Sequence, residues 1–349
     1  MHTPTILEFS RKPQSLAEAF EIYWTEHQVK SLPALDDSGR LLSYGELSDW
    51  TGTVAASLRA RGAMQGEVLA IAMGRSIEAV VLLLAAIRAG LCPCVFEPKL
   101  PPEEIDERLG LVRAKWLTFD TENSDLVKSL KTPAVTVDFS VLSAPTSVVP
   151  ARTVDPHSPA LLLFTSGSTG RPKAVQLTQA ALLNNALGVI EHTGLSVQDR
   201  LLHVMPIYHT NGVNNQLFAP LLAGAVVIFS QRSRAEDMPA LMERHHPTIM
   251  TGVPTMYSRM LSQTFSATSL ASLRFVRCGS APITETLHRE VEEKLGCPLL
   301  ISYGLSEATC TSTMNPPGAR RIGSVGTVLR GQSVRLREAD GTMTGAPGG

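Results

Sequence analysis

Residues 161–173 of this 349-residue chain read LLLFTSGSTGRPK, and they carry more information on fold and chemistry than any other stretch. An apolar run of strand length passes directly into small hydroxyl residues and glycines, which end at Lys173. Loops of this composition bind phosphate, because glycines let backbone N–H groups approach the anion and a lysine adds positive charge. The loop is not a P-loop, since Pro172 precedes the lysine and Ala174 follows it in place of serine or threonine. The stretch therefore predicts a buried strand that leads into a phosphate-binding loop.

Before this loop, the sequence alternates between helical patterns and short apolar runs. Ser76 is placed to cap a helix over 77–89, which lies between apolar runs at 67–73 and 91–96. Strand, helix and strand at this spacing predict a right-handed βαβ unit. Further predicted elements are a helix over 47–61 and strands over 116–119 and 135–139.

After residues 141–160, where serine, threonine and proline dominate, the same alternation resumes. We expect an α/β fold of two stacked βαβ lobes, with mostly parallel sheets covered by helices. The lobes would span about 42–150 and about 156–322, and a small β-rich subdomain would begin at about 323 and reach 349. The predicted strands of the later part are 160–164, 200–205, 225–229, 249–252, 275–278 and 299–303, and its predicted helices are 179–191, 214–222, 235–245 and 284–295.

The composition excludes several classes of protein. Hydrophobic residues make up 44% and charged residues 18%, which is typical of a globular chain and not of a disordered one. The formal net charge of -1 argues against a nucleic-acid binder. The longest apolar run, Ala79–Ile87, is too short to span a bilayer, and Met1–Ser10 does not resemble a signal peptide. Five scattered cysteines without C-x-x-C indicate buried thiols in a reducing cytoplasm and no zinc site.

The loop at Thr165–Lys173 resembles the signature of the adenylate-forming superfamily, which comprises acyl- and aryl-CoA synthetases, the adenylation domains of peptide synthetases, and firefly-type luciferases. Six further segments resemble motifs of that superfamily and occur in its order. They are Leu42–Leu47 (LSYGEL), the segment from Ala89-Gly90 to Pro98, Met205–Gly212 (MPIYHTNG), Cys278–Pro282 (CGSAP), Ser302–Glu307 (SYGLSE) and Gly323–Gly326 (GSVG). The seven segments together cover about residues 42 to 326.

This resemblance implies a two-step reaction with ATP, Mg²⁺ and coenzyme A. A carboxylate attacks the α-phosphorus of Mg-ATP to give an acyl-adenylate and pyrophosphate, and a thiol, usually that of coenzyme A, then displaces AMP. Such chemistry requires positioning and neutralisation of negative charge more than covalent catalysis. The resemblance therefore implies an acyl-CoA synthetase whose partners are a small carboxylic acid, ATP and coenzyme A.

The resemblance also assigns residues to the nucleotide. Glu307 would contact Mg²⁺ with Thr165 as a second contact, Lys173 would hold the phosphates, and the ring of Tyr303 would stack on adenine. Lys173, His209 and Glu307 are thus the candidate catalytic residues. Ser306 stands where the family usually has threonine, which keeps the hydroxyl. The candidate nucleotide-binding residues are Thr165, Ser166, Gly167, Ser168, Thr169, Gly170, Lys173, Gly279, Ser280, Ala281, Pro282, Tyr303, Gly304, Leu305 and Ser306.

The acyl pocket is expected beside His209, at the position where the family has its gate. No acidic residue lies between His209 and Leu222, which favours plain carboxylic acids over amino acids. Asn211, Asn214 and Asn215 either hydrogen-bond a polar or short acid or cap the following helix, and capping is the favoured interpretation. Arg259 would pair a second carboxylate or lie on the surface, and the surface is favoured. The candidate pocket residues are His209, Asn211, Gly212, Asn215, Gly252, Val253 and Gly304.

Two alternatives stay open: an amino-acid adenylation domain that serves a carrier protein, and a non-catalytic binding protein. In the family a small C-terminal domain carries a further catalytic lysine, and none of its residues can be placed in this sequence. Near the end, Val334–Arg337 alternates and Asp340-Gly341 predicts a hairpin turn, whose partner strand is expected beyond Gly349. We therefore interpret the chain as a truncated N-terminal domain and expect weak activity or none.

Overall fold

The structure is a computed structural model that describes residues 12–25, 29–37, 39–97, 99–142, 153–165, 172–230, 234–338 and 340–343. These residues form two compact units. The first unit comprises 12–183 and 206–213, and the second comprises 184–205 and 214–343. None of the helices in the described part of the chain has the length and apolar character needed to cross a membrane.

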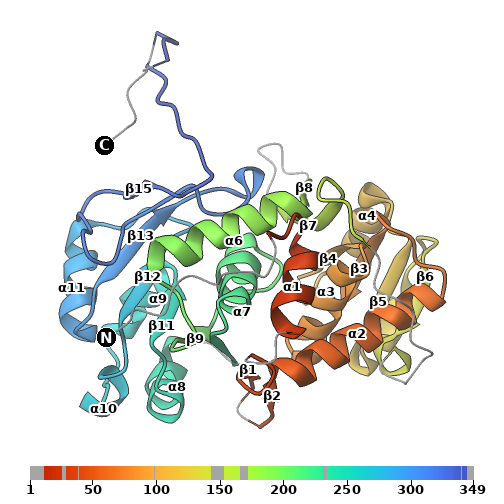
Figure 1. The fold of residues 1–349 in the computed structure, drawn as a ribbon, viewed down its shortest axis with the longest axis horizontal. Helices are drawn as coiled ribbons and strands as arrows, with labels where there is room; N and C mark the ends of the chain where they lie inside the picture. Colours follow the sequence, from red (N-terminus) through yellow and green to blue (C-terminus); the bar gives the residue numbers. More distant parts are fainter. Residues whose placement is uncertain are drawn as a thin grey trace. The chain divides into compact units, whose positions relative to one another are not determined.

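The first unit is built on a six-stranded sheet with the order β6-β5-β3-β4-β7-β8 (Figure 1). Strands β6, β5, β3, β4 and β7 run parallel to their neighbours, whereas β8 pairs antiparallel with β7. The βαβ unit predicted around residues 67–96 is confirmed, because β3 and β4 pair in parallel on either side of a helix. The strands are β3 (Val68–Ala72), β4 (Cys92–Val95), β5 (Trp116–Phe119), β6 (Val135–Asp138), β7 (Pro159–Thr165) and β8 (Lys173–Thr178).

The helices of the first unit begin where the sequence provides capping groups. Ser76 caps α3, because its side chain accepts a hydrogen bond from the backbone N–H of Ala79. Ser43 and Glu46 form a reciprocal capping box at the start of α2. A hairpin of β1 (Pro33–Asp36) and β2 (Leu41–Ser43) precedes α2. The helical segments are α1 (Leu16–Thr25), α2 (Tyr44–Ala60), α3 (Ile77–Arg88), α4 (Pro102–Val112), η1 (Thr121–Asn123), α5 (Ser124–Ser129) and η2 (Phe139–Val141).

The second unit contains the strand order β15-β14-β13-β12-β11-β9-β10. Strands β10, β9, β11, β12 and β13 are parallel, and β14 and β15 extend the sheet antiparallel from β13. The strands predicted over 249–252, 275–278 and 299–303 are confirmed. The strands are β9 (Arg200–His203), β10 (Val226–Phe229), β11 (Ile249–Gly252), β12 (Phe275–Cys278), β13 (Leu299–Tyr303), β14 (Thr313–Met314) and β15 (Thr327–Val328).

Helices cover one face of this sheet and enclose an apolar core. Helix α11 packs on α9 and helix α10 packs on α8, and the core includes Met242, Met250 and Val276 (Figure 1). The helix predicted over 214–222 begins earlier than expected, because η3 is a π-helix that starts at Asn211 and leads into α7. The segments are η3 (Asn211–Phe218), α7 (Ala219–Leu222), η4 (Ala235–Asp237), α8 (Met238–His245), α9 (Pro254–Met260), α10 (Ala267–Leu270), α11 (Glu285–Leu295) and η5 (Ser306–Ala308). Helix α6 (Gln179–Thr193) contains the boundary between the units.

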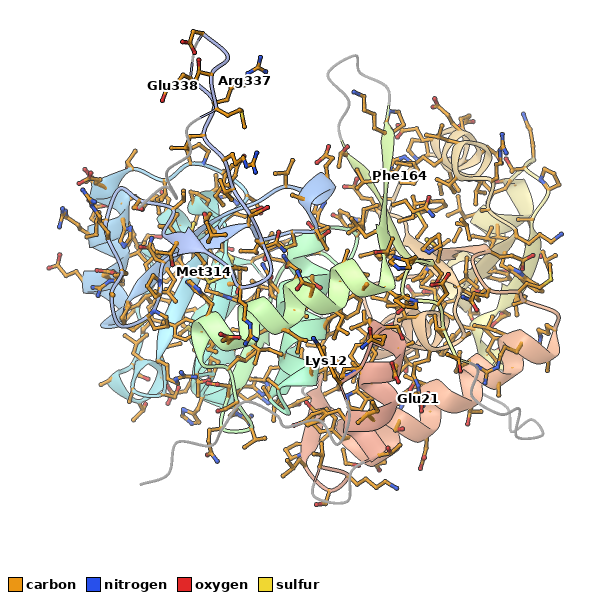
Figure 2. All side chains as sticks on the ribbon, turned by 45° about the horizontal axis from the view of Figure 1, so that its top comes forward. Lys12, Glu21, Phe164, Met314, Arg337 and Glu338 are labelled. Atoms are coloured by element: carbon orange, nitrogen blue, oxygen red, sulfur yellow. The ribbon has the colours of Figure 1, made fainter. Side chains whose placement is uncertain are left out.

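The turn predicted at Asp340-Gly341 forms within the described residues. Arg337 pairs antiparallel with Met343, and the backbone N–H of Glu338 donates to the carbonyl of Thr342 at 2.9 Å. Gly341 adopts φ +91, which a glycine tolerates in a tight turn. The pairing of this segment with a strand beyond Gly349 stays a prediction, because the single bridge between Arg337 and Met343 does not test it. Figure 2 labels Arg337 and Glu338 on this segment.

Candidate active site

The phosphate-loop motif is anchored by two paired strands of the first unit. Thr165 is the last residue of β7, Lys173 is the first residue of β8, and the two are direct partners in the antiparallel ladder. Lys173 is exposed, and Thr165 is half-buried. The loop residues Ser166, Gly167, Ser168, Thr169 and Gly170 lie outside the described residues. The fold therefore brings the two ends of the predicted loop together.

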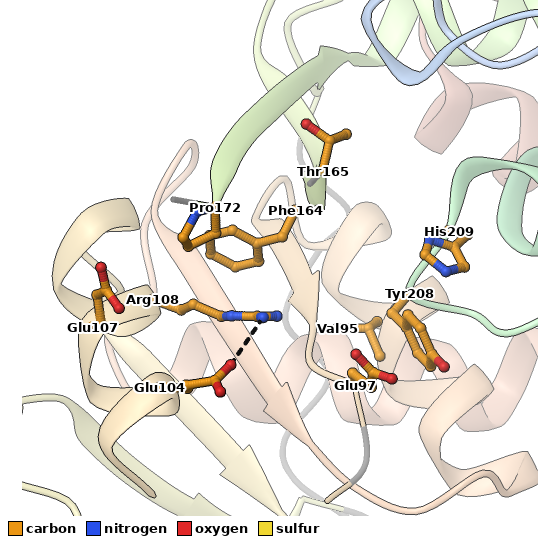
Figure 3. Close-up of a pocket in the computed structure, with 10 residues that line it drawn as sticks. All are labelled: Val95, Glu97, Glu104, Glu107, Arg108, Phe164, Thr165, Pro172, Tyr208 and His209. Carbon is orange, nitrogen blue, oxygen red and sulfur yellow. Dashed lines mark hydrogen bonds and ion pairs between the residues drawn. The ribbon is translucent and has the colours of Figure 1, made fainter. Parts of the chain in front are cut away.

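A polar cleft of about 480 Å³ lies in the first unit beside Thr165 (Figure 3). The guanidinium of Arg108 on α4 lies 3.4 Å from the Glu104 carboxylate and 5.1 Å from the centre of the Phe164 ring. Such a cation over an aromatic face is attracted by the ring and by the carboxylate together. The residues that line this cleft are Val95, Glu97, Glu104, Glu107, Arg108, Phe164, Thr165, Pro172, Tyr208 and His209.

The candidate gate residue His209 lines the same cleft and packs against Tyr208, with ring centres 4.7 Å apart. Loss of water around its ring lowers the pKa of His209, and the nearby negative charge of Glu97 only partly opposes this shift. Loss of water and repulsion by Glu97 raise the pKa of Tyr208, whose hydroxyl donates to the Glu97 carboxylate. His209 therefore offers a neutral imidazole at neutral pH.

Sequence analysis missed Glu97 and Arg108 as residues of this cleft. Glu97 follows strand β4 inside a segment that the family resemblance covered, so its place at a strand end was a usable signal. No such signal was available for Arg108, because a helix arginine is usually solvated and only the tertiary fold places it under Phe164.

The second unit holds a cleft of about 390 Å³ where two parallel strands end. Ser280, Ala281 and Pro282 follow β12, Tyr303 ends β13, and these residues line the cleft together with Gly304. The Tyr303 ring is 53% exposed, so it is not packed in the core. Ser280 has φ +67, a left-handed conformation that serines rarely adopt and that often marks a functional turn. The fold thus gathers the residues that sequence analysis assigned to adenine.

Gly279 and Gly304 make this cleft possible by close backbone approach. A Cβ atom on Gly304 would lie 1.6 Å from the carbonyl oxygen of Cys310, and one on Gly279 would lie 2.8 Å from the Ser302 hydroxyl. Thr309 and Cys310 both have positive φ, so the turn that crowds Gly304 is itself unusual. Only glycine fits at position 304 without a shift of the backbone.

This turn carries the candidate metal residue Glu307. The η5 turn holds Ser306 half-buried and Glu307 exposed, and Leu305 before it is 42% exposed. Within the described part of the chain, no cluster of three or more acidic, histidine or cysteine side chains could hold a metal by itself. Mg²⁺ that arrives with phosphates needs one or two protein oxygens, so a single exposed carboxylate fits it.

A buried hydrogen-bond network connects the π-helix with α6 and with Thr311 in the second unit. The side-chain amide of Asn215 donates to Thr311 Oγ1 at 2.9 Å, and that of Asn214 donates to Asn185 Oδ1 at 2.7 Å. Both residues are buried inside η3, so the capping interpretation is wrong for these two, whereas Asn211 is the first residue of that helix. The surface interpretation of Arg259 is confirmed.

The candidate acyl-pocket residues are distributed over the two units. His209, Asn211 and Gly212 belong to the first unit. Asn215, Gly252, Val253 and Gly304 belong to the second, where a Cβ atom on Gly252 would lie 3.1 Å from the Tyr257 ring.

The cysteines are not part of either cleft's chemistry. Cys92, Cys94, Cys278, Cys297 and Cys310 are all buried and unpaired, as the sequence predicted. Burial raises the pKa of Cys92, Cys278 and Cys297 to about 12 and that of Cys94 well above its usual value. A buried thiol with a raised pKa is a poor nucleophile, because the thiolate is the reactive form.

Comparison with known proteins agrees with this geometry. The sequence matches the profile of the family described as AMP-binding enzyme over residues 23–349. Sulfoacetate–CoA ligase of Cupriavidus necator is 29% identical over 304 residues, which are 83% of this chain and 60% of that protein. Oxalate–CoA ligase of Arabidopsis thaliana is 30% identical over 340 residues, which are 90% of this chain and 66% of that protein.

Solved structures share the fold. The crystal structure of ATP-bound MatB from Rhodopseudomonas palustris superimposes with a TM-score of 0.86 and 30% identity, over 94% of this chain and 68% of that one. The chain therefore spans about 60 to 66% of the length of the CoA ligases compared above. Because the family profile covers nearly all of its residues, this chain belongs to the family of AMP-binding enzymes.

Proposed function

We propose that the protein to which these residues belong activates a carboxylic acid with ATP and transfers the acyl group to coenzyme A. A carboxylate oxygen would attack the α-phosphorus, the bond to pyrophosphate would break, and the thiol of coenzyme A would then displace AMP. The single observation that carries the proposal is the cleft in the second unit, where Tyr303, Gly304 and the turn Ser280–Pro282 come together. A flat ring fits between an exposed aromatic side chain and a turn of small residues.

The remaining roles follow from charge and position. Thr165 and Lys173, at the two ends of the Ser/Gly loop, would bind the phosphates, and Glu307 with Thr165 would hold Mg²⁺. The ion would supply positive charge where negative charge accumulates on the phosphates. His209, neutral at physiological pH, would donate a hydrogen bond in the region of the acid without adding a second charge.

The acceptor and the acid distinguish this proposal from its alternative. Enterobactin synthase component F of Escherichia coli is 28% identical over 311 residues, which are 24% of that protein, so an adenylation domain with a carrier-protein partner has support as well. A plain carboxylic acid, and with it the CoA-ligase function, is preferred over an amino acid because the segment from His209 to Leu222 has no acidic residue to pair an amino group. Pyrophosphate exchange with amino acids against simple carboxylic acids separates the two functions.

We further propose that residues 1–349 correspond to the large N-terminal domain of a cytoplasmic ligase. The matched part of the CoA ligases is about 60 to 66% of their length. We therefore expect these 349 residues alone to bind ATP and acid weakly and to turn over poorly. Full turnover in a coupled pyrophosphate-release assay would contradict this expectation, and nucleotide binding without any adenylation of an acid in a longer chain would favour a non-catalytic binding protein.

The experiment that tests the nucleotide site is calorimetric titration of ATP with Mg²⁺ into the wild-type chain and into Tyr303→Ala. We expect weaker ATP binding by the variant, because the ring that would stack on the base is removed. Equal ATP binding by both proteins would contradict the assignment of this cleft to adenine.

A further inference from the structure

Arg277 is a buried arginine in the middle of a sheet strand. Its neighbours Val276 and Cys278 point into the apolar core, and since side chains alternate along a strand, Arg277 points to the opposite face. It is only 2% exposed. Its Nε donates to Thr251 Oγ1 at 2.9 Å, and its Nη2 donates to the backbone carbonyl of Asn215 at 2.9 Å. An unusual cation thus lies between β11, β12 and the π-helix.

This cation has no partner of opposite charge in the part of the chain that the structure describes. The acidic residue whose field reaches Arg277 is Asp199, and Asp199 is already bound by Arg274 at 2.5 and 2.6 Å. Nη1 of Arg277 makes no hydrogen bond to any described residue. Burial lowers the pKa of Arg277 to about 10, so the side chain is still charged at neutral pH. A buried charge without a counter-ion is costly, and arginine recognises carboxylates and other oxyanions better than any other side chain does.

The surroundings of Arg277 are those predicted for the acyl pocket. Thr251 directly precedes Gly252 and Val253, and Asn215 is itself a candidate pocket residue. Asn215 is bonded to Thr311, which follows the Cys310 carbonyl that crowds Gly304. In the same network Oδ1 of Asn214 and Nε2 of Gln216 are buried without a partner among the described residues. Polar groups left unsatisfied in a protein interior indicate that a further polar group belongs there.

We propose that Arg277 is a specificity-determining residue that selects a short acid carrying a second anionic group. This inference rests on the proposed function, because one carboxylate of the acid must remain free to react with ATP. The second anionic group would pair with the guanidinium and supply the counter-ion that the described residues do not provide. Arg259, which was the sequence-based candidate for this role, is exposed on α9 and does not take part.

The test is calorimetric titration of malonate and of succinate, each against its monoamide, which keeps the size of the acid and removes the second charge. The protein is the 349-residue chain saturated with a non-hydrolysable ATP analogue and Mg²⁺. We expect the wild type to bind the better diacid at least about tenfold more tightly than its monoamide, as hydrogen bonds to charged groups imply. Arg277→Gln should abolish this preference, and Arg277→Lys should keep part of it. Arg259→Gln, which removes the same charge from the surface, is the matched control and should keep it in full.

A second measurement separates specificity from a structural role. If Arg277 awaits a counter-ion, Arg277→Met should leave the melting temperature of the acid-free protein unchanged or raise it, because an uncompensated buried charge is removed. A clear fall in melting temperature, or an unchanged diacid preference in Arg277→Gln, would overturn the inference. Binding of the ATP analogue with no diacid preference in the wild type would overturn it while leaving the proposed function intact. Preferential binding of the diacid by a wild type that binds no ATP analogue would refute the proposed function, and with it this inference.

Discussion

The two clefts of this protein are built in different ways. In the first unit, side chains define the cleft: Arg108 lies between Glu104 and the Phe164 ring, and Tyr208 is bonded to Glu97. In the second unit, the backbone defines it, through the left-handed Ser280 and the close approach of Gly304 to Cys310. Side-chain contacts at a surface are worth little individually, whereas a backbone clash cannot be relieved locally. Substitutions should therefore be more damaging in the second cleft than in the first.

The largest effect is expected from Gly304→Ala. The new Cβ atom would lie 1.6 Å from a backbone oxygen, so the turn at Thr309–Cys310 must move. We expect a loss of about 3 kcal/mol or more in the free energy of unfolding, together with loss of ATP binding, as for severe overpacking. Urea denaturation measures the first effect and titration of ATP the second.

The matched control for Gly304→Ala is Gly318→Ala in the same unit, where a Cβ atom would meet nothing within 4 Å. It should change the free energy of unfolding by less than about 1 kcal/mol. Equal stability of the two variants would show that the backbone does not define this cleft as described.

The next largest effect is expected from Tyr303→Ala on ATP affinity. Loss of an aromatic ring that stacks on a base costs about 1–3 kcal/mol of binding free energy, and the dissociation constant should rise about five- to 150-fold. The ring is 53% exposed, so the melting temperature should barely change. Tyr303→Phe keeps the ring and should keep the affinity, and weak binding by this variant would contradict stacking.

A smaller effect is expected at Glu292, behind the second cleft. Its carboxylate accepts hydrogen bonds from Arg320 at 2.5 and 2.8 Å, from the Leu299 backbone at 2.8 Å and from His288 at 3.2 Å. Partial burial would raise the pKa of Glu292, but these hydrogen bonds outweigh burial and lower it. The ionised Glu292 therefore adds to the free energy of unfolding at any pH above the ordinary glutamate pKa. This addition is lost as pH falls through the lowered pKa of Glu292 in the folded protein.

Glu292→Gln should therefore reduce the free energy of unfolding by about 1–2 kcal/mol at pH 7 and by less at pH 3. Urea denaturation at the two pH values measures this difference. Glu290→Gln on the exposed side of α11 is the control and should show neither change. A loss in Glu292→Gln that is the same at both pH values would contradict a role for its charge.

The smallest effect is expected in the first cleft, on the titration of His209. Loss of water lowers the pKa of its ring below 6.5 and Glu97 opposes this, so Glu97→Gln should lower the pKa further. NMR titration of the imidazole protons measures the change directly. Glu107→Gln, in the same cleft but not among the groups that shift His209, should have no effect, and an upward shift in Glu97→Gln would refute the electrostatic account.

Protonation of His209 at low pH destabilises the folded state, whereas protonation of a histidine in an ion pair stabilises it. The folded state disfavours the charged ring. The free energy of unfolding is therefore unaffected by His209 well above pH 6.5 and decreases as pH falls below that value. His209→Gln should therefore flatten the stability profile slightly between pH 7 and pH 5, by only a few tenths of a kcal/mol, because solvent still reaches part of this side chain and screens its charge.

The sequence by itself determined the family and many of the elements, whereas α1, α4, β8 and α9 were not among the predicted segments. Strands such as Trp116–Phe119 and Phe275–Cys278 appear where short apolar runs predicted them, and Ser76 caps its helix, because these features depend on neighbours a few residues away. The two motifs around Ser280 and Tyr303 also lie together in the second unit, as the sequence predicted, because parallel strands place their carboxyl ends at one edge of a sheet.

Only the tertiary structure decided which side chains meet. The antiparallel pairing of β7 with β8, the inward turn of Asn214 and Asn215, and the position of Arg108 under Phe164 all depend on contacts that local pattern does not encode. Arg277 is the clearest case: its sequence neighbourhood is an ordinary strand, yet the fold buries its charge beside Asn215, 62 residues away. Burial and charge pairing are properties of the assembled fold, so a single sequence could not determine them.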